Sequence, residues 1–478
     1  MSYLTTSVFY LLRSGISEKT SEDRVSNSDI IYLCTTLLYP IGGWLADTRV
    51  GRYRMIRCSM WIMWTGIIVA TFGEVVADLS TVYKLYIKKW VFYGLYTIIA
   101  SGLAGFQSNI VQLGIDQLTD SSATEISSFI MWYTLTFYAS GFTVYFISDC
   151  VVDKYKLFEI KMLFVALCLT LALCSEIFFR HWLLREHITG KSIRLILKVI
   201  RYTLSNSRLR YSFATENELP SRFDIAKHKY GGPFMAQQVD NVRKFLWMLP
   251  ILASFGIVYG AITPLSYAKQ KVERRFHDWL EARGITGCYE NLSIHYSYAI
   301  YVIVFVVLYE FVIHPLFHTC IPKVRITSRF LLGTVLLFLW IMSLLGIEAV
   351  TYHRNNGVKC TFTTYFEIRI SYKWLLTSGF LMGLSSFFLI TSGLEFIWAQ
   401  APSTMKGLVL GLAYTFLGLG TSLHTLLLSP FALKMPVPVS WKHTKLSCRI
   451  WYFLIEGVII LLVLILLSVL IKRCKKKP

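Results

Sequence analysis

One acidic residue lies deep inside an apolar segment of this sequence. The stretch from Leu375 to Met405 is long and apolar enough to belong in a bilayer, yet Glu395 lies well inside it. A carboxylate at that depth costs roughly 2.5–3.5 kcal/mol on insertion scales, so it needs a partner, a proton or a water-filled cavity. Two interpretations remain open. Glu395 either snorkels or caps a helix near the interface, or it faces a cavity through which something polar passes.

The composition predicts that the rest of the chain is also a helical membrane protein. Of 478 residues, 55% are hydrophobic and only 16% are charged, whereas about 25% of the residues of a soluble protein are charged. Apolar runs of spanning length recur throughout, so we expect an all-α polytopic membrane protein. The formal net charge of +20 could suggest nucleic acid, but the Lys and Arg residues lie mostly between spans. Membrane topology explains this distribution more simply, so membrane lipids are expected partners and nucleic acid is not.

Other kinds of chemistry have no matching pattern of residues. The ten Cys residues are scattered without a C-x-x-C pair, which excludes a sequence-evident zinc or redox motif. His314, His318 and Cys320 have a suggestive spacing but no acidic partner, so we expect no metal site there. The sequence shows no Ser/His/Asp set and no P-loop. We therefore expect no enzyme activity and no bound cofactor.

The apolar segment 30–45 ends in a dense motif. It reads Gly42-Gly43-Trp44-Leu45-Ala46-Asp47, followed after three residues by Gly51-Arg52. Four arginines, at positions 49, 52, 54 and 57, mark this loop as cytoplasmic. The paired glycines allow close approach of helices. The Asp47 carboxylate can form ion pairs with the loop arginines, or it can bind the N-terminus of a helix that faces it.

The longest polar stretch, residues 180–244, divides the spans into two halves. Within it, Lys191, Arg194, Lys198 and Arg201 recur at helical spacing opposite apolar residues, which predicts a basic amphipathic helix suited to an anionic inner leaflet. We therefore expect three regions: an N-terminal transmembrane bundle over 1–183 with an incomplete first helix, a cytoplasmic linker over 184–243, and a C-terminal transmembrane bundle over 244–478.

The loop after the seventh span carries signals of an outside location. Asn291-Leu292-Ser293 is a glycosylation sequon, and counting spans from the basic linker puts it on the lumenal or extracellular side. The same count puts Cys288 and Cys360 outside, where a disulfide is allowed. We expect a glycoprotein modified at Asn291.

The Gly42–Arg52 motif resembles the signature of the proton-dependent oligopeptide transporter family, part of the major facilitator superfamily. The linker resembles that of animal members, including the solute carrier family 15-like peptide/histidine branch. Segments on four further spans also resemble the family: Gly102–Asn109 with Asp116-Gln117 at the fourth, Trp132–Gly141 at the fifth, Glu310 at the eighth, and Leu394-Glu395-Phe396 with Gln400-Ala401-Pro402 at the tenth.

The resemblance implies a fold and a mechanism. Two six-helix bundles would rock about a midplane site in alternating access, importing di- and tripeptides or histidine with protons as the coupling ion. Glu395 would bind the amino terminus of the substrate, and the other expected binding positions are Gln107, Tyr138 and Ser386. The expected location is a multi-pass protein of the plasma membrane or of the endosomal or lysosomal membrane.

Several positions depart from the family pattern. Gln107 stands where the family has Lys, Tyr138 where Asn is usual, and Ser386 where an acid is usual. The sequence also starts after the position expected for the family's first-helix Glu-x-x-Glu-Arg motif, so either the gene model is truncated or this element has been lost. Glu395 is then interpreted as the last charged member of a reduced site. The alternative function is accordingly a family member with lost proton coupling: a uniporter, or a receptor or scaffold that does not transport.

Overall fold

The computed structural model describes ten parts of the chain, and all of them are built mainly from helices. These parts are residues 34–79, 86–118, 121–147, 158–182, 192–206, 221–262, 297–313, 326–354, 372–432 and 446–476. The predicted glycosylation site at Asn291, the allowed disulfide between Cys288 and Cys360, and the group around His314 lie outside these parts, as do residues 1–33.

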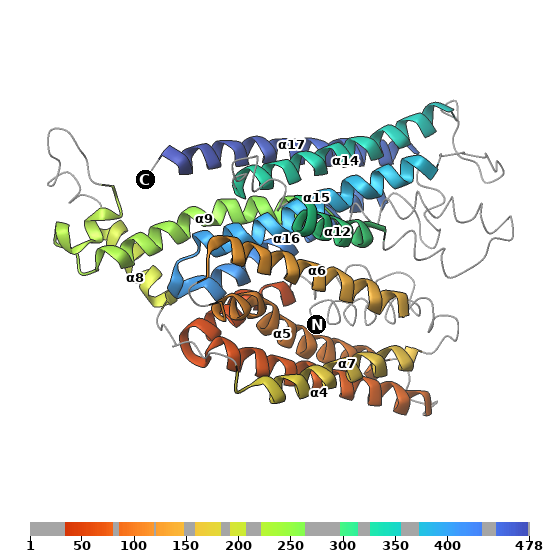
Figure 1. Ribbon diagram of the computed structural model, residues 1–478, viewed down its shortest axis with the longest axis horizontal. Coiled ribbons are helices and arrows are strands. Elements are labelled where there is room, and N and C mark those ends of the chain that lie inside the picture. Colours follow the sequence, from red (N-terminus) through yellow and green to blue (C-terminus); the bar gives the residue numbers. More distant parts are fainter. Residues whose placement is uncertain are drawn as a thin grey trace.

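The helices of the first bundle lie together in the lower part of Figure 1. They are α3 (Leu38–Leu45) with the π-helical turn η1 (Ala46–Val50), α4 (Arg52–Leu79), α5 (Tyr86–Asp116), α6 (Ala123–Ile147) and α7 (Phe158–Phe179). Buried apolar side chains of α4, α5 and α7, such as Met63, Ile99 and Leu169, form the core of this bundle.

The helices of the second bundle lie above the first (Figure 1). They are α9 (Ala236–Gly260), α12 (Ser297–Leu308) with the π-helical turn η7 (Tyr309–Ile313), α14 (Ile326–Arg354), α15 (Tyr372–Gln400), α16 (Lys406–Ala432) and α17 (Leu446–Lys476). The short turn η8 (Ser403–Met405) joins α15 to α16. Trp340, Leu389 and Ile460 lie in the core of this bundle, where α9, α14, α15 and α17 meet.

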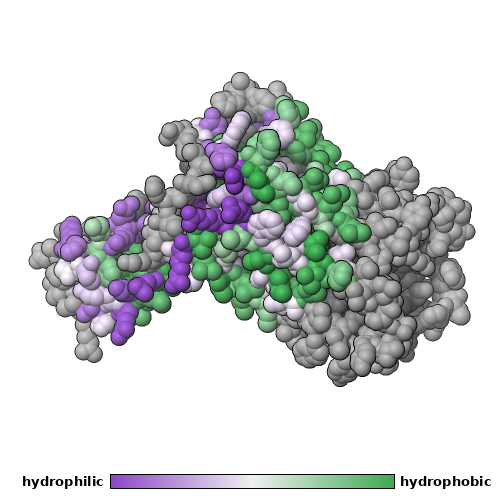
Figure 2. All heavy atoms as spheres, turned by 90° about the horizontal axis from the view of Figure 1, so that it is seen from below, coloured by the Kyte–Doolittle hydropathy of each residue, from purple (hydrophilic) through white to green (hydrophobic). Residues whose placement is uncertain are grey.

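Length, composition and surface all indicate a membrane protein. Seven of the described helices are long and apolar enough to cross a bilayer. The face shown in Figure 2 is hydrophobic across its middle, and its hydrophilic residues gather toward one end. Large apolar side chains stay exposed on α4 and α7, among them Trp61, Val69, Phe72, Leu163, Leu167 and Leu171. Such a surface is costly in water and suits lipid, so this is a multi-pass membrane protein.

Described helices of the two bundles pack against each other in two places. Helix α16 packs against α3 and α5, while α6 packs against α12 and α15. The α3–α16 contact depends on Gly43, because a Cβ atom built there would lie 2.0 Å from the carbonyl oxygen of Gly407. Gly43 therefore brings helices of different bundles into backbone contact, whereas Gly42 lies against Gly105 of α5 in its own bundle.

The linker packs as a small unit against the start of α9. The basic amphipathic helix forms as α8 (Ser192–Ser205), with Arg194, Lys198 and Arg201 exposed. Ile196 and Val199 are buried in the same apolar cluster as α9 side chains, so protein rather than lipid covers this part of the apolar face. The 3-10 turns η5 (Asp224–Ala226) and η6 (His228–Tyr230) follow.

An ion-pair network fixes these turns to α9. The Lys227 Nζ lies 2.8 Å from Asp224 Oδ1 and 2.9 Å from Asp240 Oδ1, and Arg243 approaches the same two acids. Burial alone would raise the pKa of Asp224, but hydrogen bonds from Lys227 and Ser221 outweigh it and lower the pKa. The charged form of Asp224 therefore stabilises the junction.

Candidate functional site

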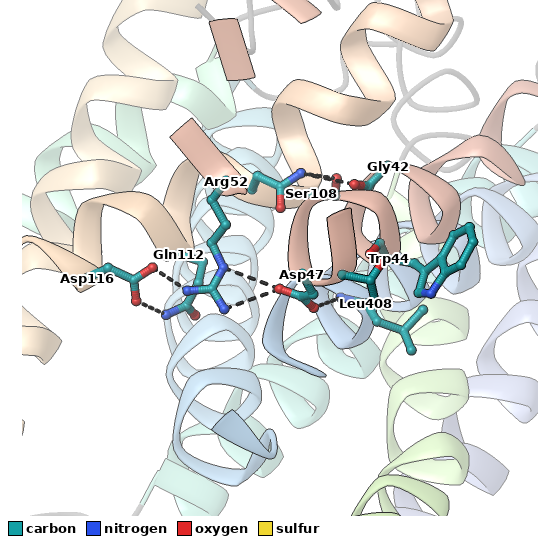
Figure 3. A network of polar contacts seen from close by, with 10 residues as sticks. Gly42, Trp44, Asp47, Arg52, Ser108, Gln112, Asp116 and Leu408 are labelled. Carbon is teal, nitrogen blue, oxygen red and sulfur yellow. Dashed lines mark hydrogen bonds and ion pairs between the residues drawn. The ribbon is translucent and has the colours of Figure 1, made fainter. Parts of the chain in front are cut away.

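Asp47 joins the two bundles at the end that carries the loop arginines, which we expect to be the cytoplasmic end (Figure 3). Its Oδ1 accepts hydrogen bonds from Arg52 Nη2 at 3.2 Å and Nε at 3.4 Å. Its Oδ2 accepts one at 3.0 Å from the backbone N–H of Leu408, in the first turn of α16. A carboxylate is favourable there because it satisfies an unpaired N–H group and faces the positive end of the helix dipole.

Arg52 extends this network to α5. Its guanidinium also forms an ion pair with Asp116, whose Oδ1 accepts a hydrogen bond from Gln112 Nε2 at 2.5 Å. One cation thus lies between two buried carboxylates, an arrangement that offsets the cost of burying three charges. Gly51, with φ of 83°, makes the turn that places Arg52 opposite Asp47.

The structure brings most of the predicted motif residues into this network. Asp47, Arg52 and Asp116 pair directly, and the Asn109 amide reaches the carbonyl oxygen of Gly42 at 3.4 Å. The Gln117 amide donates to the backbone of its own helix, at Leu113, at 3.4 Å.

Glu395 forms a second link between the bundles. It lies near the C-terminal end of α15, and its side chain is only 5% exposed. Arg329 Nη2 on α14 forms an ion pair with Glu395 Oε2, and the Ser127 hydroxyl on α6 donates to Oε1. The description of Glu395 as the last charged member of its site is therefore wrong: Arg329, whose side chain is 6% exposed, is a charged partner.

A parallel contact lies one residue further along α6. The Ser128 hydroxyl donates to Glu310 Oε1 on η7 of the second bundle. Two consecutive serines of the first bundle therefore bind two carboxylates of the second. Like the Asp47 contact, these bonds cross the bundle interface, so they hold only while the bundles are closed at this end.

Aromatic and neutral polar side chains fill the middle of the interface. The Tyr39 hydroxyl donates to Gln107 Oε1 at 2.9 Å, and the Tyr39 ring stacks on Tyr414 of α16 with centroids 5.5 Å apart. The hydroxyls of Tyr138 on α6 and Tyr259 on α9 lie 3.4 Å apart. Two of the expected binding positions, Gln107 and Tyr138, thus bind partners in a cluster shared by both bundles.

Ser386 lies deeper along α15 than Glu395. It is 1% exposed, and its Oγ has no hydrogen-bond partner among the described residues. Nine residues of helix separate the two side chains, or about 13 Å at 1.5 Å per residue. They therefore occupy different levels of the helix rather than one subsite.

Sequence reasoning missed Arg329, Ser127, Tyr39 and Tyr414. Arg329 follows two basic residues at the start of a span, where a topogenic charge is the ordinary interpretation. The glycines of α16 suggested close packing in the sequence, whereas nothing in the sequence distinguished its partly buried Tyr414. Of these residues, only Arg329 could have been found from the sequence, because it is a cation inside the first turn of an apolar segment.

The fold and these contacts define a class of protein: a polytopic α-helical membrane protein of the major facilitator type, with polar contacts across its two bundles. A family model, PTR2, described as the POT family, matches residues 53–439. The chain belongs to the POT family, as the sequence motifs predicted, and this is a family of transporters, not of enzymes.

Individual relatives are similar over most of their length. The Arabidopsis thaliana "Protein NRT1/ PTR FAMILY 5.2" is 24% identical, with 89% of this chain and 80% of that protein covered. "Solute carrier family 15 member 3" of Rattus norvegicus is 20% identical, with 95% and 85% covered. The structure of the POT family transporter PepTSo has a TM-score of 0.62 at 14% identity, with 98% and 97% covered. At that identity the solved structure supports the shared fold alone.

Proposed function

We propose that this protein is a secondary transporter that imports small peptides, or histidine, by alternating access, with protons as the coupling ion. One observation carries the proposal: the buried Glu395 is held by Arg329 from its own bundle and by Ser127 from the other. A carboxylate with one partner on each side of a moving interface changes its surroundings whenever the bundles move.

The contacts at the cytoplasmic end suggest what that movement changes. Separation of the bundles there breaks the hydrogen bonds from Leu408 to Asp47, from Ser127 to Glu395 and from Ser128 to Glu310. The released carboxylate oxygens are then free for water, for a proton or for the ammonium of a substrate. An ammonium is the natural partner of a carboxylate in a site of low polarity.

The neutral part of the interface supports a substrate with amide groups. Gln107, Tyr138 and Ser386 offer hydrogen-bonding groups without a fixed charge. The surrounding tyrosine rings also suit an ammonium group, through cation–π attraction. The relatives fit this substrate class, since one solved structure is of a POT family transporter in complex with 5-aminolevulinic acid, which carries an amine and a carboxylate.

Uptake into proteoliposomes with an imposed proton gradient tests the proposal. We expect labelled dipeptide or histidine to accumulate in vesicles of the parent protein. Glu395→Gln should lower the uptake rate about tenfold or more, and a tenfold change corresponds to roughly 1.4 kcal/mol of lost interaction free energy. Glu125→Gln, the same change at an exposed acid on α6, is the matched control. Equal uptake by Glu395→Gln and the parent would contradict the assignment.

A transporter without proton coupling is the second candidate. It is favoured by the uncharged Gln107, which is buried and hydrogen-bonded to Tyr39, and by the uncharged Ser386. Such a protein equilibrates substrate across the vesicle membrane, and an imposed gradient does not change the final level. A receptor or scaffold would instead show no uptake at all.

The particular membrane also belongs to the proposal. We place the protein in the plasma membrane or in an endosomal or lysosomal membrane, where an inward proton gradient can exist. Fluorescent tagging with markers of these membranes distinguishes them, and a location in a membrane without such a gradient argues against proton-driven import.

A further inference from the structure

A buried pair of ionisable residues lies away from the site described above. His424 on α16 and Glu456 on α17 are both 0% exposed, and His424 Nδ1 lies 2.6 Å from Glu456 Oε2. The other ring nitrogen, Nε2, lies 2.9 Å from the backbone carbonyl oxygen of Ile257 on α9. The pair therefore joins three helices of the second bundle.

These two contacts fix the number of protons in the site. A carbonyl oxygen can only accept, so Nε2 carries a proton and donates it to Ile257. If Nδ1 and the carboxylate were both bare, two lone pairs would face each other at 2.6 Å, which is repulsive. One further proton must lie between them, carried either by the imidazolium or by the carboxyl group. In both cases the pair has no net charge.

The surroundings make this shared proton costly to remove. On α17, Tyr452 lies one turn before Glu456 and its hydroxyl interacts with that carboxyl group. From α14, Ile341 and Met342 pack around Gly457 beside it. On α9, the ionisable Tyr259 directs its hydroxyl to Tyr138 instead. Loss of the proton would leave a net negative charge among these neutral groups, and a buried charge without a partner is strongly unfavourable.

Helix α16 connects this pair to the interface between the bundles. Its first turn carries Leu408, which binds Asp47, and further along Thr415 donates to the carbonyl oxygen of Thr36 before α3. Gly420, one turn before His424, is packed so tightly on α9 that a Cβ there would lie 2.1 Å from the Gly256 carbonyl oxygen. A change in how α16 packs on α9 and α17 is therefore transmitted to its contacts with the first bundle.

We propose that His424 and Glu456 form a proton-binding site of this transporter, which holds one shared proton while the bundles are closed at the cytoplasmic end and releases it when α16 shifts. The coupling role rests on the proposed transport function. The existence of the site does not, because it follows from the geometry of the pair.

The pH dependence of thermal unfolding of the purified full-length protein tests the site without any substrate. A proton that the geometry holds in the folded pair, and that the unfolded chain releases, makes the unfolding temperature of the parent fall as the pH rises. In Glu456→Gln, the side-chain amide can donate to Nδ1 of His424 without a shared proton. This variant should fold, and the pH-dependent loss should largely disappear.

Two further variants complete this test. His424→Gln also removes the shared proton and should show the same reduced pH dependence, even if its unfolding temperature is lower throughout. His181→Gln, the same change at an exposed histidine, should keep the pH dependence of the parent. Identical pH dependence in the parent, Glu456→Gln and His424→Gln would overturn the proposed site.

Proteoliposome transport tests the coupling. With an inward proton gradient, Glu456→Gln should lose accumulation of labelled dipeptide down to the level seen without a gradient, while substrate exchange continues. Full gradient-driven accumulation in this variant would refute the coupling. If the parent itself transports nothing, the proposed function fails, and the unfolding experiment still decides whether the proton site exists.

Discussion

The Asp47 carboxylate in the turn η1 accepts a hydrogen bond from the backbone N–H of Leu408 in the first turn of α16, at 3.0 Å. This bond joins two residues 361 positions apart and links the two bundles. Arg52 holds the other carboxylate oxygen, so Asp47 is oriented from one bundle and bound by the other.

Replacing Asp47 with Asn should weaken closure at the cytoplasmic end. The amide loses the ion pair with Arg52 and the favourable charge at the α16 N-terminus, a loss of about 1–3 kcal/mol. The distance distribution between spin labels at the exposed positions Arg54 and Ser403, in a cysteine-free background, should broaden toward longer values. Glu125→Gln, at an exposed acid of the same end, should leave it unchanged. An unaltered distribution in Asp47→Asn would show that this bond does not hold the bundles together.

The Arg329–Glu395 pair should show strong coupling in a double-mutant cycle. Removing either partner leaves the other charge buried and unpaired, which typically costs roughly 3–5 kcal/mol. Arg329→Gln and Glu395→Gln alone should each lower the unfolding temperature in detergent. In the double variant, the unfolding temperature should fall by much less than the sum of the two single decreases, because no uncompensated charge remains. Strictly additive losses would mean that the two side chains do not depend on each other.

Gly43→Ala should push α3 and α16 apart. The new Cβ would lie 2.0 Å from the Gly407 carbonyl oxygen, a backbone atom that cannot move alone. We expect a lower unfolding temperature and reduced uptake. Gly94→Ala is the matched control, because a Cβ there meets nothing within 4 Å, and alanine favours a helix by about 1 kcal/mol over glycine. Similar behaviour of the two variants would argue against the close packing.

The linker junction should loosen in acid. The pKa of Asp224 is lowered in the folded state, so its stabilising contribution is present above the ordinary value of about 3.9 and is lost as the pH falls through the lower folded value. Asp224→Asn should therefore accelerate proteolytic cleavage of the linker at neutral pH. The expected increase corresponds to a loss of roughly 1 kcal/mol in the local stability of the junction. At low pH, with an acid-tolerant protease, the difference from the parent should shrink. A difference that persists there would mean that the charge of Asp224 is not responsible.

Local sequence patterns predicted the fold class and the motif network well. The length and apolarity of the segments require helices in a bilayer, because each segment satisfies its own backbone hydrogen bonds. The charges around Asp47 and Arg52 lie close together in the chain, so their pairing could be inferred from the spacing of the motif. Membership of the family, which the motifs along the chain predicted, is confirmed by the family model over residues 53–439.

By itself, the sequence determined that Glu395 is an acid buried in a span and therefore in need of a partner. Only the tertiary structure decided that the partners are Arg329 and Ser127, which come from two other helices and from both bundles. In the same way, His424 and Glu456 are isolated residues in the sequence, and helix packing brings them to 2.6 Å. The physical reason is that charge pairing inside a membrane depends on which helix faces meet. The periodicity of one segment does not determine which face of another helix it will contact.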